Sequence, residues 1–465
     1  MKKIFFFILI IASFLEAQEI KVVQLVNSDS LIGTAINNER VRILFGNVHL
    51  IHEDIQIFCD KGIQYLESNK AELEGNIRII QGNQVLTTQK GFYFGNTKTA
   101  FGTKGITLYD GKITLKADSG EYFFDQKKAL FKGNVILFDD TTELKSNQLT
   151  YFTEKEHAIA IGSVQVTQFE NKIYSDTLNY FRQKRFSIAQ GNVLAFNMKD
   201  NLKIYSDYLE NNQINNYSYV TGQPVLIQID TTSENRIDTL VIVAEKMESY
   251  RDTADIFVAL DSVKIWRDEL SAICDYAIYD KSSGKIITST NNEIQPLFWY
   301  GENLAYGDSI EIFVEENKLK FANIYQNAFL ISKDTLMEHR FNQMNGDFIQ
   351  LRFATDTLSN QNKLREVFIV GNALSIYYLY EENEPSGLNK SSSDSALIVI
   401  EDNKVAEVKL FGSPEGEYHP EEKVIGKEKD FLLSGFKWIE NRPMKEELLS
   451  RRRIFDHQDH FMLQK

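Results

Sequence analysis

Gly133-Asn134-Val135-Ile136-Leu137 is the stretch that decides the fold, because its pattern recurs along the chain at a fixed spacing. Gly-Asn followed by a β-branched residue also begins at Gly46, Gly75 and Gly191, and Gly162 begins the close variant Gly-Ser-Val. These five glycines are separated by 29, 58, 29 and 29 residues. A period of this length indicates a repeat protein in which each unit is one small supersecondary element.

A second marker lies half a period before the glycines: a small residue, then Asp or Asn, then Tyr four residues later. Ala117-Asp118 with Tyr122 is an example. The Asp or Asn precedes the next repeat glycine by 15 residues at Asp60, Asp118, Asn147, Asp176 and Asp207. A catalytic residue is needed once, whereas a corner residue is needed in every unit, so this recurrence favours a structural role. The predicted turn and corner residues are Asp60, Asp118, Asn147, Asp176, Gly75, Gly133, Gly162 and Gly191.

Residues after each Gly-Asn alternate in polarity, as in Val164-Gln165-Val166, which is the period of two expected for strands. Gly-Asn supplies turn chemistry, so we expect two to three short strands per unit with turns between them. A unit this small cannot bury its own apolar face, and stacked units must share one core. The predicted interior ladder consists of Val48, Leu50, Ile77, Ile79, Val135, Leu137, Val164, Val166 and Val193.

Composition agrees with an all-β fold and limits the partners. Hydrophobic residues make up 43% of the 465 residues, which is enough for a sizeable core, and the 32 Phe and 21 Tyr favour strands. The formal net charge of −14 argues against nucleic acid as a partner, since phosphate binding needs Lys and Arg.

The N-terminus has the features of a secretory signal peptide at residues 1–17. Lys2 and Lys3 precede the apolar run Ile4–Leu15, and Ala17 stands at the expected cleavage position. The apolar run is too short to span a bilayer as a helix. We therefore expect an exported protein.

The remaining chain divides into three predicted segments. Residues 18–225 carry the regular repeat, residues 226–415 a looser continuation with longer loops, and residues 416–465 a C-terminal tail. Ser386–Ser395, rich in serine, is the best candidate for a mobile loop. Pro443–Leu449 favours a short helix in the tail.

The only two cysteines, Cys59 and Cys274, both occupy the small-residue position of the second marker. About seven units separate them, and stacking at ~4.8 Å per strand places them roughly 34 Å apart. A disulfide needs Cα atoms within about 7 Å, so we predict two free thiols.

Catalytic, metal and cofactor motifs are not found in the sequence. There is no phosphate loop, nucleophile elbow or zinc pattern, and we expect neither an enzyme nor a cofactor. His49 and His52 have weak metal spacing, but strand alternation points them to opposite faces, which favours structural roles.

The order Asp-x-x-x-Tyr, a polar break and Gly-Asn-Val resembles the repeat of the OstA-like (organic solvent tolerance protein A-like) family, the periplasmic lipopolysaccharide-transport proteins of Gram-negative bacteria. The matching residues are Ala117-Asp118, Tyr122 and Gly133-Asn134-Val135, and then Ser175-Asp176, Tyr180 and Gly191-Asn192-Val193. The match is clear over roughly residues 20–225 and fainter to about 415. This chain is longer than the small bridge proteins of that family, and its second half drifts from the motif.

The resemblance implies an elongated twisted β-jelly-roll, built as a slot open along one side, in which the ladder residues line a site for lipid acyl chains. It implies a periplasmic location, lipopolysaccharide as ligand, and two partners: an inner-membrane export complex and an outer-membrane assembly protein. Unpaired strand edges at the ladder ends further suggest end-to-end self-association.

Two other functions are also compatible with the sequence. A carbohydrate-active β-helix enzyme would need a cluster of Asp, Lys and Arg outside the repeat, and none is evident. A structural or adhesive exported β-solenoid would have a filled core and no ligand. An open slot would favour the lipid carrier over this scaffold.

Overall fold

The computed structural model describes residues 21–231, 237–251, 255–290, 295–315, 318–334, 336–355, 362–401 and 404–452. The expected signal peptide at residues 1–17 lies outside them. The chain divides into two compact units: unit 1 comprises residues 1–140 and 148–154, and unit 2 comprises residues 141–147 and 155–465. The all-β prediction is confirmed, since strands build both units and the helices are short. Within the described ranges, no helix has the length and apolar character needed to cross a membrane.

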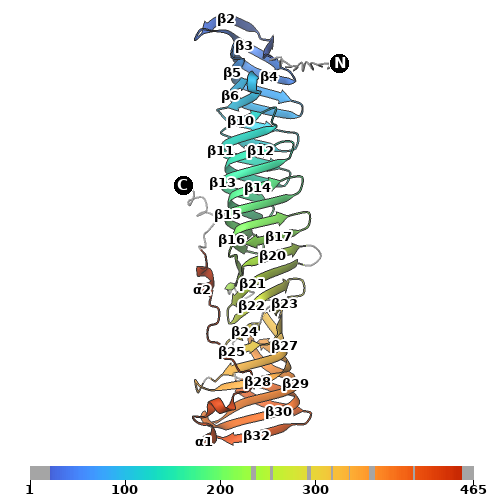
Figure 1. Cartoon of the computed structure of the whole chain (residues 1–465), viewed down its shortest axis with the longest axis vertical. Coiled ribbons are helices and arrows are strands. Elements are labelled where there is room, and N and C mark those ends of the chain that lie inside the picture. The colour runs from blue at the N-terminus through green and yellow to red at the C-terminus, as the bar shows by residue number, and fades with distance from the viewer. Residues whose placement is uncertain are drawn as a thin grey trace, which may run out of the picture. The chain divides into compact units, whose positions relative to one another are not determined.

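Unit 1 is a stack of antiparallel strands, drawn as successive rungs in Figure 1. Its strands are β1 (Gln24–Asn27), β2 (Ser30–Ile36), β3 (Glu39–His52), β4 (Ile55–Tyr65), β5 (Lys70–Gln81), β6 (Gln84–Phe94), β7 (Thr99–Gly102), β8 (Ile106–Tyr109), β9 (Thr114–Ala117), β10 (Ser119–Phe123) and β11 (Lys128–Asp139). The 3-10 helix η1 (Gly95–Thr97) follows β6, and β12 (Thr142–Phe152) has residues in both units. β7 with β8, and β9 with β10, act as the two halves of single rungs because each pair shares the same neighbouring strands.

Unit 2 continues the same antiparallel pattern within itself. Its strands are β13 (His157–Gln168), β14 (Asn171–Phe181), β15 (Phe186–Asn197), β16 (Leu202–Asn212), β17 (Tyr217–Thr221), β18 (Val225–Thr231), β19 (Ile237–Val243), β20 (Lys246–Arg251), β21 (Asp255–Arg267), β22 (Leu270–Asp280), β23 (Lys285–Ser289), β24 (Leu297–Tyr300), β25 (Asn303–Tyr306), β26 (Ser309–Glu315), β27 (Lys318–Lys333), β28 (Phe341–Thr355), β29 (Asn362–Glu381), β30 (Glu384–Glu401), β31 (Lys404–Phe411) and β32 (Glu415–Pro420). Three short helices follow: α1 (Glu421–Val424), η2 (Glu428–Phe431) and α2 (Lys445–Ser450).

Each long strand bends once near its middle, at a point that we call the corner. In β5, the pairing register with β6 shifts between Glu74 and Ile77. Gly75 and Asn76, which lie between them, have φ angles of 77° and 42°. Two left-handed residues in a row form a β-bulge, which bends the strand. Glycine is required at the first position, because a Cβ on Gly75 would lie 2.4 Å from Oδ2 of Asp60.

The expectation that Gly-Asn separates short strands is therefore wrong. Gly75-Asn76 lies inside β5, and Gly191-Asn192 lies inside β15. The chain reverses instead at polar breaks such as residues 66–69 and 82–83. Bulges and hairpin turns both need positive φ, so the sequence pattern by itself does not separate them.

The corner divides every rung into two arms. Arm A runs from the corner to one row of turns, which we call row A, and arm B runs to the other, row B. Row A in unit 1 contains residues 66–69, 95–98, 124–127 and 153–154, and row B contains residues 53–54, 82–83 and 110–112. In unit 2, row A includes residues 182–185, 213–216 and 281–284, and row B includes residues 169–170 and 198–201.

The core lies between the two arms. On β5, Ala71 and Leu73 of arm A and Ile77 of arm B are buried, whereas the outward-facing Arg78 is exposed. A Cβ on Gly62 of arm A would lie 3.7 Å from Cγ1 of Val48 on arm B, so the two inner faces are in contact. In unit 2, one buried cluster likewise joins Phe298 of arm B to Ile312 of arm A.

Ser386–Ser395, expected to be a mobile loop, lies inside β30, and that expectation is wrong. The buried hydroxyls of Ser375 and Ser391 are hydrogen-bonded at 2.6 Å across the β29–β30 pair. The N–H of Asp394 donates to the carbonyl of Gly412 at 3.0 Å, as Asp29 and Asp118 do to Gly46 and Gly133. Ser391 and Ser393 are therefore small inward-facing residues of a strand, and the corner pattern outweighs the preference of serine for loops.

Both cysteines are free and buried, as predicted. Cys59 pairs with Val48 in β3, and Cys274 pairs with Val263 in β21, each directly beside a corner. Burial raises the pKa of both thiols to about 12, so they stay protonated at neutral pH.

Candidate functional site

The predicted ladder residues lie between the arms, with one partial exception. In unit 1, the inner faces of β3, β5 and β11 contribute Val48, Leu50, Ile77, Ile79, Val135 and Leu137, each 0–2% exposed. In unit 2, Val164 and Val193 are fully buried, but Val166 is only half-buried. The structure thus forms one continuous apolar interior in each unit from side chains that alternate along successive strands.

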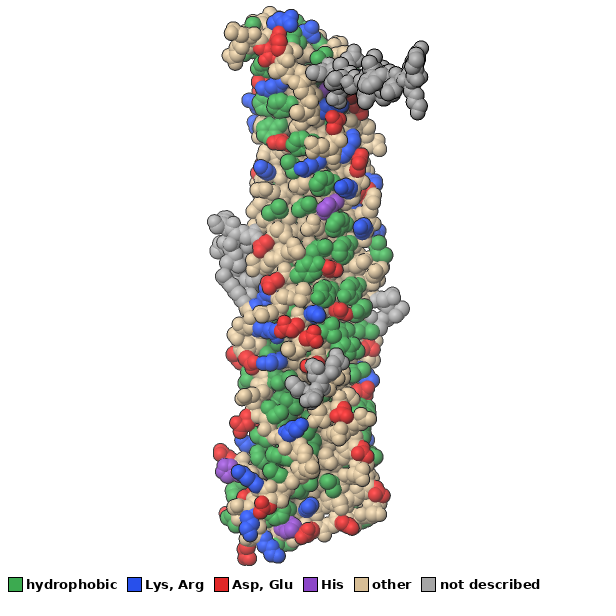
Figure 2. All heavy atoms as spheres, in the orientation of Figure 1, with side chains coloured by type: hydrophobic (Ala, Val, Ile, Leu, Met, Phe, Trp, Pro, Cys, Tyr) green, Lys and Arg blue, Asp and Glu red, His purple; other side chains and the backbone are tan. Residues whose placement is uncertain are grey.

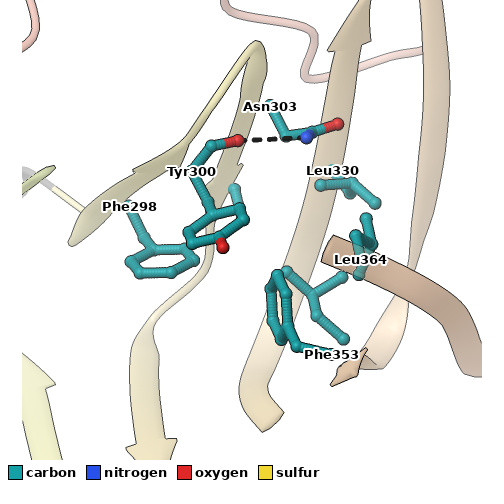
Figure 3. Close-up of a pocket in the computed structure, with 8 residues that line it drawn as sticks. Phe298, Tyr300, Asn303, Leu330, Phe353 and Leu364 are labelled. Atoms are coloured by element: carbon teal, nitrogen blue, oxygen red, sulfur yellow. Dashed lines mark hydrogen bonds between the residues drawn. The ribbon is translucent and has the colours of Figure 1, made fainter. Parts of the chain in front are cut away.

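This interior is filled by protein side chains. Leu50 and Leu137 pair with Ile57 and Leu115 on neighbouring strands, and almost none of their surface is left for solvent. A small, partly open apolar pocket lies in unit 2 between β24 and β27–β29 (Figure 3). Phe298, Tyr300 and Phe353 line it, and the Tyr300 and Phe353 rings meet edge to face at 4.8 Å. The pocket leaves no room even for a water-sized group, so it offers no space for acyl chains.

The predicted corner residues come together in pairs across adjacent strands. The Asn76 amide donates to Oδ2 of Asp60 at 2.9 Å, and Asn134 donates to Asp118 at 2.8 Å. Gly162 and Gly191 occupy the same positive-φ position, with φ of 78° and 76°, opposite Asn147 and Asp176. These carboxylates accept local hydrogen bonds at exposed bends, and no group of potential metal ligands occurs among the described residues.

Some corners do not show the full sequence pattern. Asp261-Ser262 and Gln326-Asn327 have the same pair of positive φ angles without a glycine. Asn327 donates to Asp308 at 3.2 Å, so its corner keeps the hydrogen bond of the repeat. Asp29, one unit before the first recognised marker, accepts from Asn47 at 3.0 Å. The signal for these corners is the Asn or Ser alone, which is too common to be recognised by spacing.

Rows A and B face each other along one side of unit 1, and polar side chains bridge them; we call this line of contacts the seam. Nζ of Lys98 in row A lies 3.0 Å from Oε2 of Glu53 in row B. Nζ of Lys127 in row A donates to Oε1 of Gln81, the last residue of arm B before row B, at 2.5 Å.

The tyrosines of the second marker supply the buried part of the seam. Tyr122 donates to Oε1 of Gln84 at 2.5 Å, and Nε2 of Gln84 donates to Thr153 at 3.0 Å. One rung further, Tyr151 donates to Oδ2 of Asp110 at 2.8 Å. Each tyrosine lies on arm A, each acceptor belongs to arm B or row B, and both rings are 0–1% exposed. Burial raises the pKa of Tyr122 to about 12, so its hydroxyl remains a donor at neutral pH.

At the first rungs, a histidine and the chain itself complete the seam. Nε2 of His52 contacts the carbonyl of Lys21 at 2.9 Å, which requires the proton on Nε2 and leaves Nδ1 to accept from the Tyr93 hydroxyl at 2.7 Å. Gln64, which replaces the marker tyrosine, donates to the carbonyl of Val23 at 2.7 Å. His52 therefore has a structural role, and His49 stacks on Phe58 on the outer face at 4.3 Å.

Unit 2 carries a feature that sequence reasoning missed: residues 421–452, which we call the C-terminal strap, run beside the strands (Figure 1). Val424 and Leu433 of the strap join a buried cluster with Trp299, Phe329 and other residues of arm B. Leu448 of α2 joins another with residues of β14–β19. These clusters lie on the outer face of arm B, because the alternate residues of the same strands, such as Leu330, face the core.

The strap is fixed by polar contacts along its length. Arg340 is fully buried, contacts Glu421 at 2.5 Å and Glu428 at 3.5 Å, and lies over the Tyr378 ring at 4.8 Å. Burial opposes a charge on Arg340, but its hydrogen bond and attraction to Glu421 raise its pKa. Further along, the indole of Trp299 donates to the carbonyl of Ile439 at 3.2 Å. The signal in the sequence is a set of aliphatic and aromatic residues within a charged tail.

Charge is mixed on the outer surface. Figure 2 shows acidic and basic side chains interspersed over the drawn face, with hydrophobic side chains between them. Several outward aromatic rings are covered by lysines: Nζ of Lys70 lies 4.7 Å from the Phe92 ring centre and that of Lys116 lies 5.9 Å from Phe138. The lysine stems shield these rings from solvent.

The fold and interior define a class: two-armed antiparallel β-repeat proteins whose rungs enclose one apolar core. Within this class, residues 20–176 match the model of the OstA-like protein family, so the resemblance read from the repeat is confirmed over this segment. A comparison with curated proteins finds no match for the chain.

Proposed function

We propose that this protein is an exported, periplasmic, non-enzymatic carrier that shields lipopolysaccharide acyl chains during their transport to the outer membrane. The observation that carries the proposal is the apolar interior of unit 1, which is built by the segment that matches the OstA-like family. Every rung adds apolar surface to this interior, and an acyl chain gains about 0.8 kcal/mol for each CH₂ group that leaves water. Such a site serves binding and needs no catalytic group.

The polar part of the ligand would stay outside the arms. Among the described residues of unit 1 no Lys or Arg is buried, whereas lysines such as Lys98 and Lys127 lie along the seam. Phosphorylated head groups would meet these lysines, or divalent cations, at the surface while the acyl chains lie inside.

End strands offer the contacts for the proposed partners. β2 of unit 1 is almost fully exposed, and Leu31 and Ile32 are 47% and 54% exposed. β31 and β32 of unit 2 are also exposed, and both pair with β30. Free strand edges dock further strands by augmentation, so we propose that the ends join an inner-membrane export complex, an outer-membrane assembly protein or a second copy.

Site-specific photo-crosslinking in living cells tests the carrier function. A photoreactive residue at Leu137 faces the interior, and the same residue at Phe138, its 38%-exposed neighbour on β11, faces outward as a matched control. We expect lipopolysaccharide to crosslink at position 137 and not at 138. Absence of lipid at position 137, and also at Leu50 and Ile79, would remove the carrier function.

The filled interior favours one second candidate, a structural β-solenoid without a ligand. In that case the ladder residues are an ordinary core, and position 137 would crosslink only to the protein itself. The same experiment therefore separates the two candidates.

A further inference from the structure

The seam closes the interior of unit 1 along its whole described length. Bridges from row A or arm A to row B or arm B occur at His52–Tyr93, Glu53–Lys98, Gln84–Tyr122 and Asp110–Tyr151. The interior behind them holds ladder residues that are 0–2% exposed. A lipid that binds between the arms must therefore either separate the arms at the seam or enter at an end of the stack.

The strands bend at the corners, and the seam consists of individually weak side-chain contacts. The arms are covalently joined at each corner, where consecutive residues such as Gly133 and Asn134 have φ of 77° and 45°. Backbone hydrogen bonds connect rungs along each arm, whereas the contacts described across the seam are made by side chains, joined at the first rungs by the carbonyls of Lys21 and Val23. Opening the seam thus breaks a few side-chain hydrogen bonds and leaves the strand ladders intact.

We propose that the seam is the entry site for the acylated lipid, and that the buried arm A tyrosines Tyr93, Tyr122 and Tyr151 set how readily it opens. The apolar rings of these residues belong to the interior, while their hydroxyls hold the opposite arm. When the arms separate, the rings stay available to contact an acyl chain, and the released Gln84 and Asp110 turn to solvent beside the lipid head group. This inference rests on the proposed function for its ligand, although the opening of the seam can be measured without lipid.

Lys98 provides a matched pair of crosslinks for the test. Its Nζ contacts Glu53 across the seam at 3.0 Å and Asp125, which is also in row A, at 3.2 Å. A short bismaleimide joining Lys98→Cys to Glu53→Cys locks the seam. The same reagent joining Lys98→Cys to Asp125→Cys staples two turns of one row and leaves the seam free. The native thiols are buried and protonated, and they react poorly with maleimides.

Loading of purified lipopolysaccharide onto the full chain is then read with a photoreactive residue at Leu50, directly behind this part of the seam. We expect the 98–53 crosslink to abolish lipid crosslinking at Leu50 and the 98–125 crosslink to leave it unchanged. Equal loading in both would show that lipid enters elsewhere, and would overturn the proposal. No loading in the uncrosslinked chain would instead count against the proposed function.

A measurement without lipid distinguishes failure of the seam proposal from failure of the proposed carrier function. With Leu50→Cys in place of the photoreactive residue, maleimide labelling of that buried thiol reports opening of the arms. The 98–53 crosslink should slow labelling strongly relative to the 98–125 crosslink. Identical labelling rates in the two crosslinked proteins would overturn the seam as an opening, whatever the ligand.

The tyrosine hydroxyls are tested with single-atom changes. Tyr93→Phe and Tyr122→Phe keep the ring and remove the bridge, so labelling at Leu50→Cys and lipid loading should both rise several-fold. Tyr65→Phe is the control, because its hydroxyl donates to Glu72 at 3.1 Å within arm A and does not cross the seam. A rise with Tyr65→Phe equal to that with Tyr93→Phe would show general loosening and overturn the role of the buried arm A tyrosines.

Discussion

The outer faces of arm B differ between β5 in unit 1 and β27 in unit 2. On β5, Ile77 and Ile79 face the core, and Arg78 between them is exposed to solvent. On β27, Phe329, Leu330 and Ile331 are all buried, because Leu330 faces the core and its two neighbours face the C-terminal strap. A strand with one solvated face alternates in polarity, whereas a strand covered on both faces is continuously apolar. The same rung thus supports either a two-layer or a three-layer arrangement, depending on what covers it.

Truncation after Pro420 should have the largest effect, because it removes the strap that covers the outer face of unit 2. Removing residues 421–465 exposes the outer apolar face of β24–β29, and buried strap side chains such as Val424, Leu433 and Leu448 each contribute about 1.5–3 kcal/mol. We expect unit 2 to lose roughly 5 kcal/mol or more, with strong aggregation. Hydrogen exchange measured by mass spectrometry should show faster exchange in β24–β29 and no change in β3–β6. Equal loss of protection in both regions would contradict a strap that acts on its own unit alone.

Arg340→Ala should have the next largest effect, since it leaves Glu421 and Glu428 without their buried cation. Both glutamates are partly exposed, so we expect a loss of about 3 kcal/mol in the free energy of unfolding of unit 2. The tryptophans Trp266, Trp299 and Trp438 all belong to unit 2, and their fluorescence in urea measures this loss. Arg352→Ala is the control in the same unit, because its ion pair with Glu366 is exposed and its removal should leave unfolding unchanged.

Val135→Ala and Val166→Ala apply one chemical change to two ladder positions. Val135 is 1% exposed in unit 1, and its truncation should cost about 2 kcal/mol from lost burial and a new cavity. Val166 is half-buried in unit 2, so its truncation should cost less than about 1 kcal/mol. Urea unfolding followed by circular dichroism compares them. Equal losses would mean that Val166 belongs to the closed interior as fully as Val135 does.

The smallest effect is expected at the corners, where the two units should behave alike. Asp118→Ala removes the acceptor of Asn134 in unit 1, and Asp308→Ala removes that of Asn327 in unit 2. Each hydrogen bond lies near solvent, so each change should cost about 0.5–1.5 kcal/mol. Thermal unfolding of both variants, with the surface change Glu121→Ala in unit 1 as reference, measures this cost. A much larger loss in one unit would show that its corners contribute more to stability than those of the other unit.

Much of the fold of unit 1 could be predicted from the sequence. Gly75 and Asp60 mark the corner because only glycine fits opposite that carboxylate, and the period of two after it orients Ile77 and Ile79 inward. The prediction failed where one pattern has two structural meanings. Gly-Asn is compatible with a bulge or a hairpin, and Ser391 and Ser393 suit a loop as well as the crowded inner face of a strand.

The sequence by itself determined the repeat, the all-β class, the inward side of each regular strand and the two free thiols, because these follow from local spacing and alternation. Only the tertiary structure decided which residues meet across the seam and what covers the outer face of unit 2. Tyr122 meets Gln84 and Trp299 meets Ile439 because folding brings distant segments together. Such contacts leave no periodic trace in the chain, since each partner is chosen by position in space and not by spacing along the sequence.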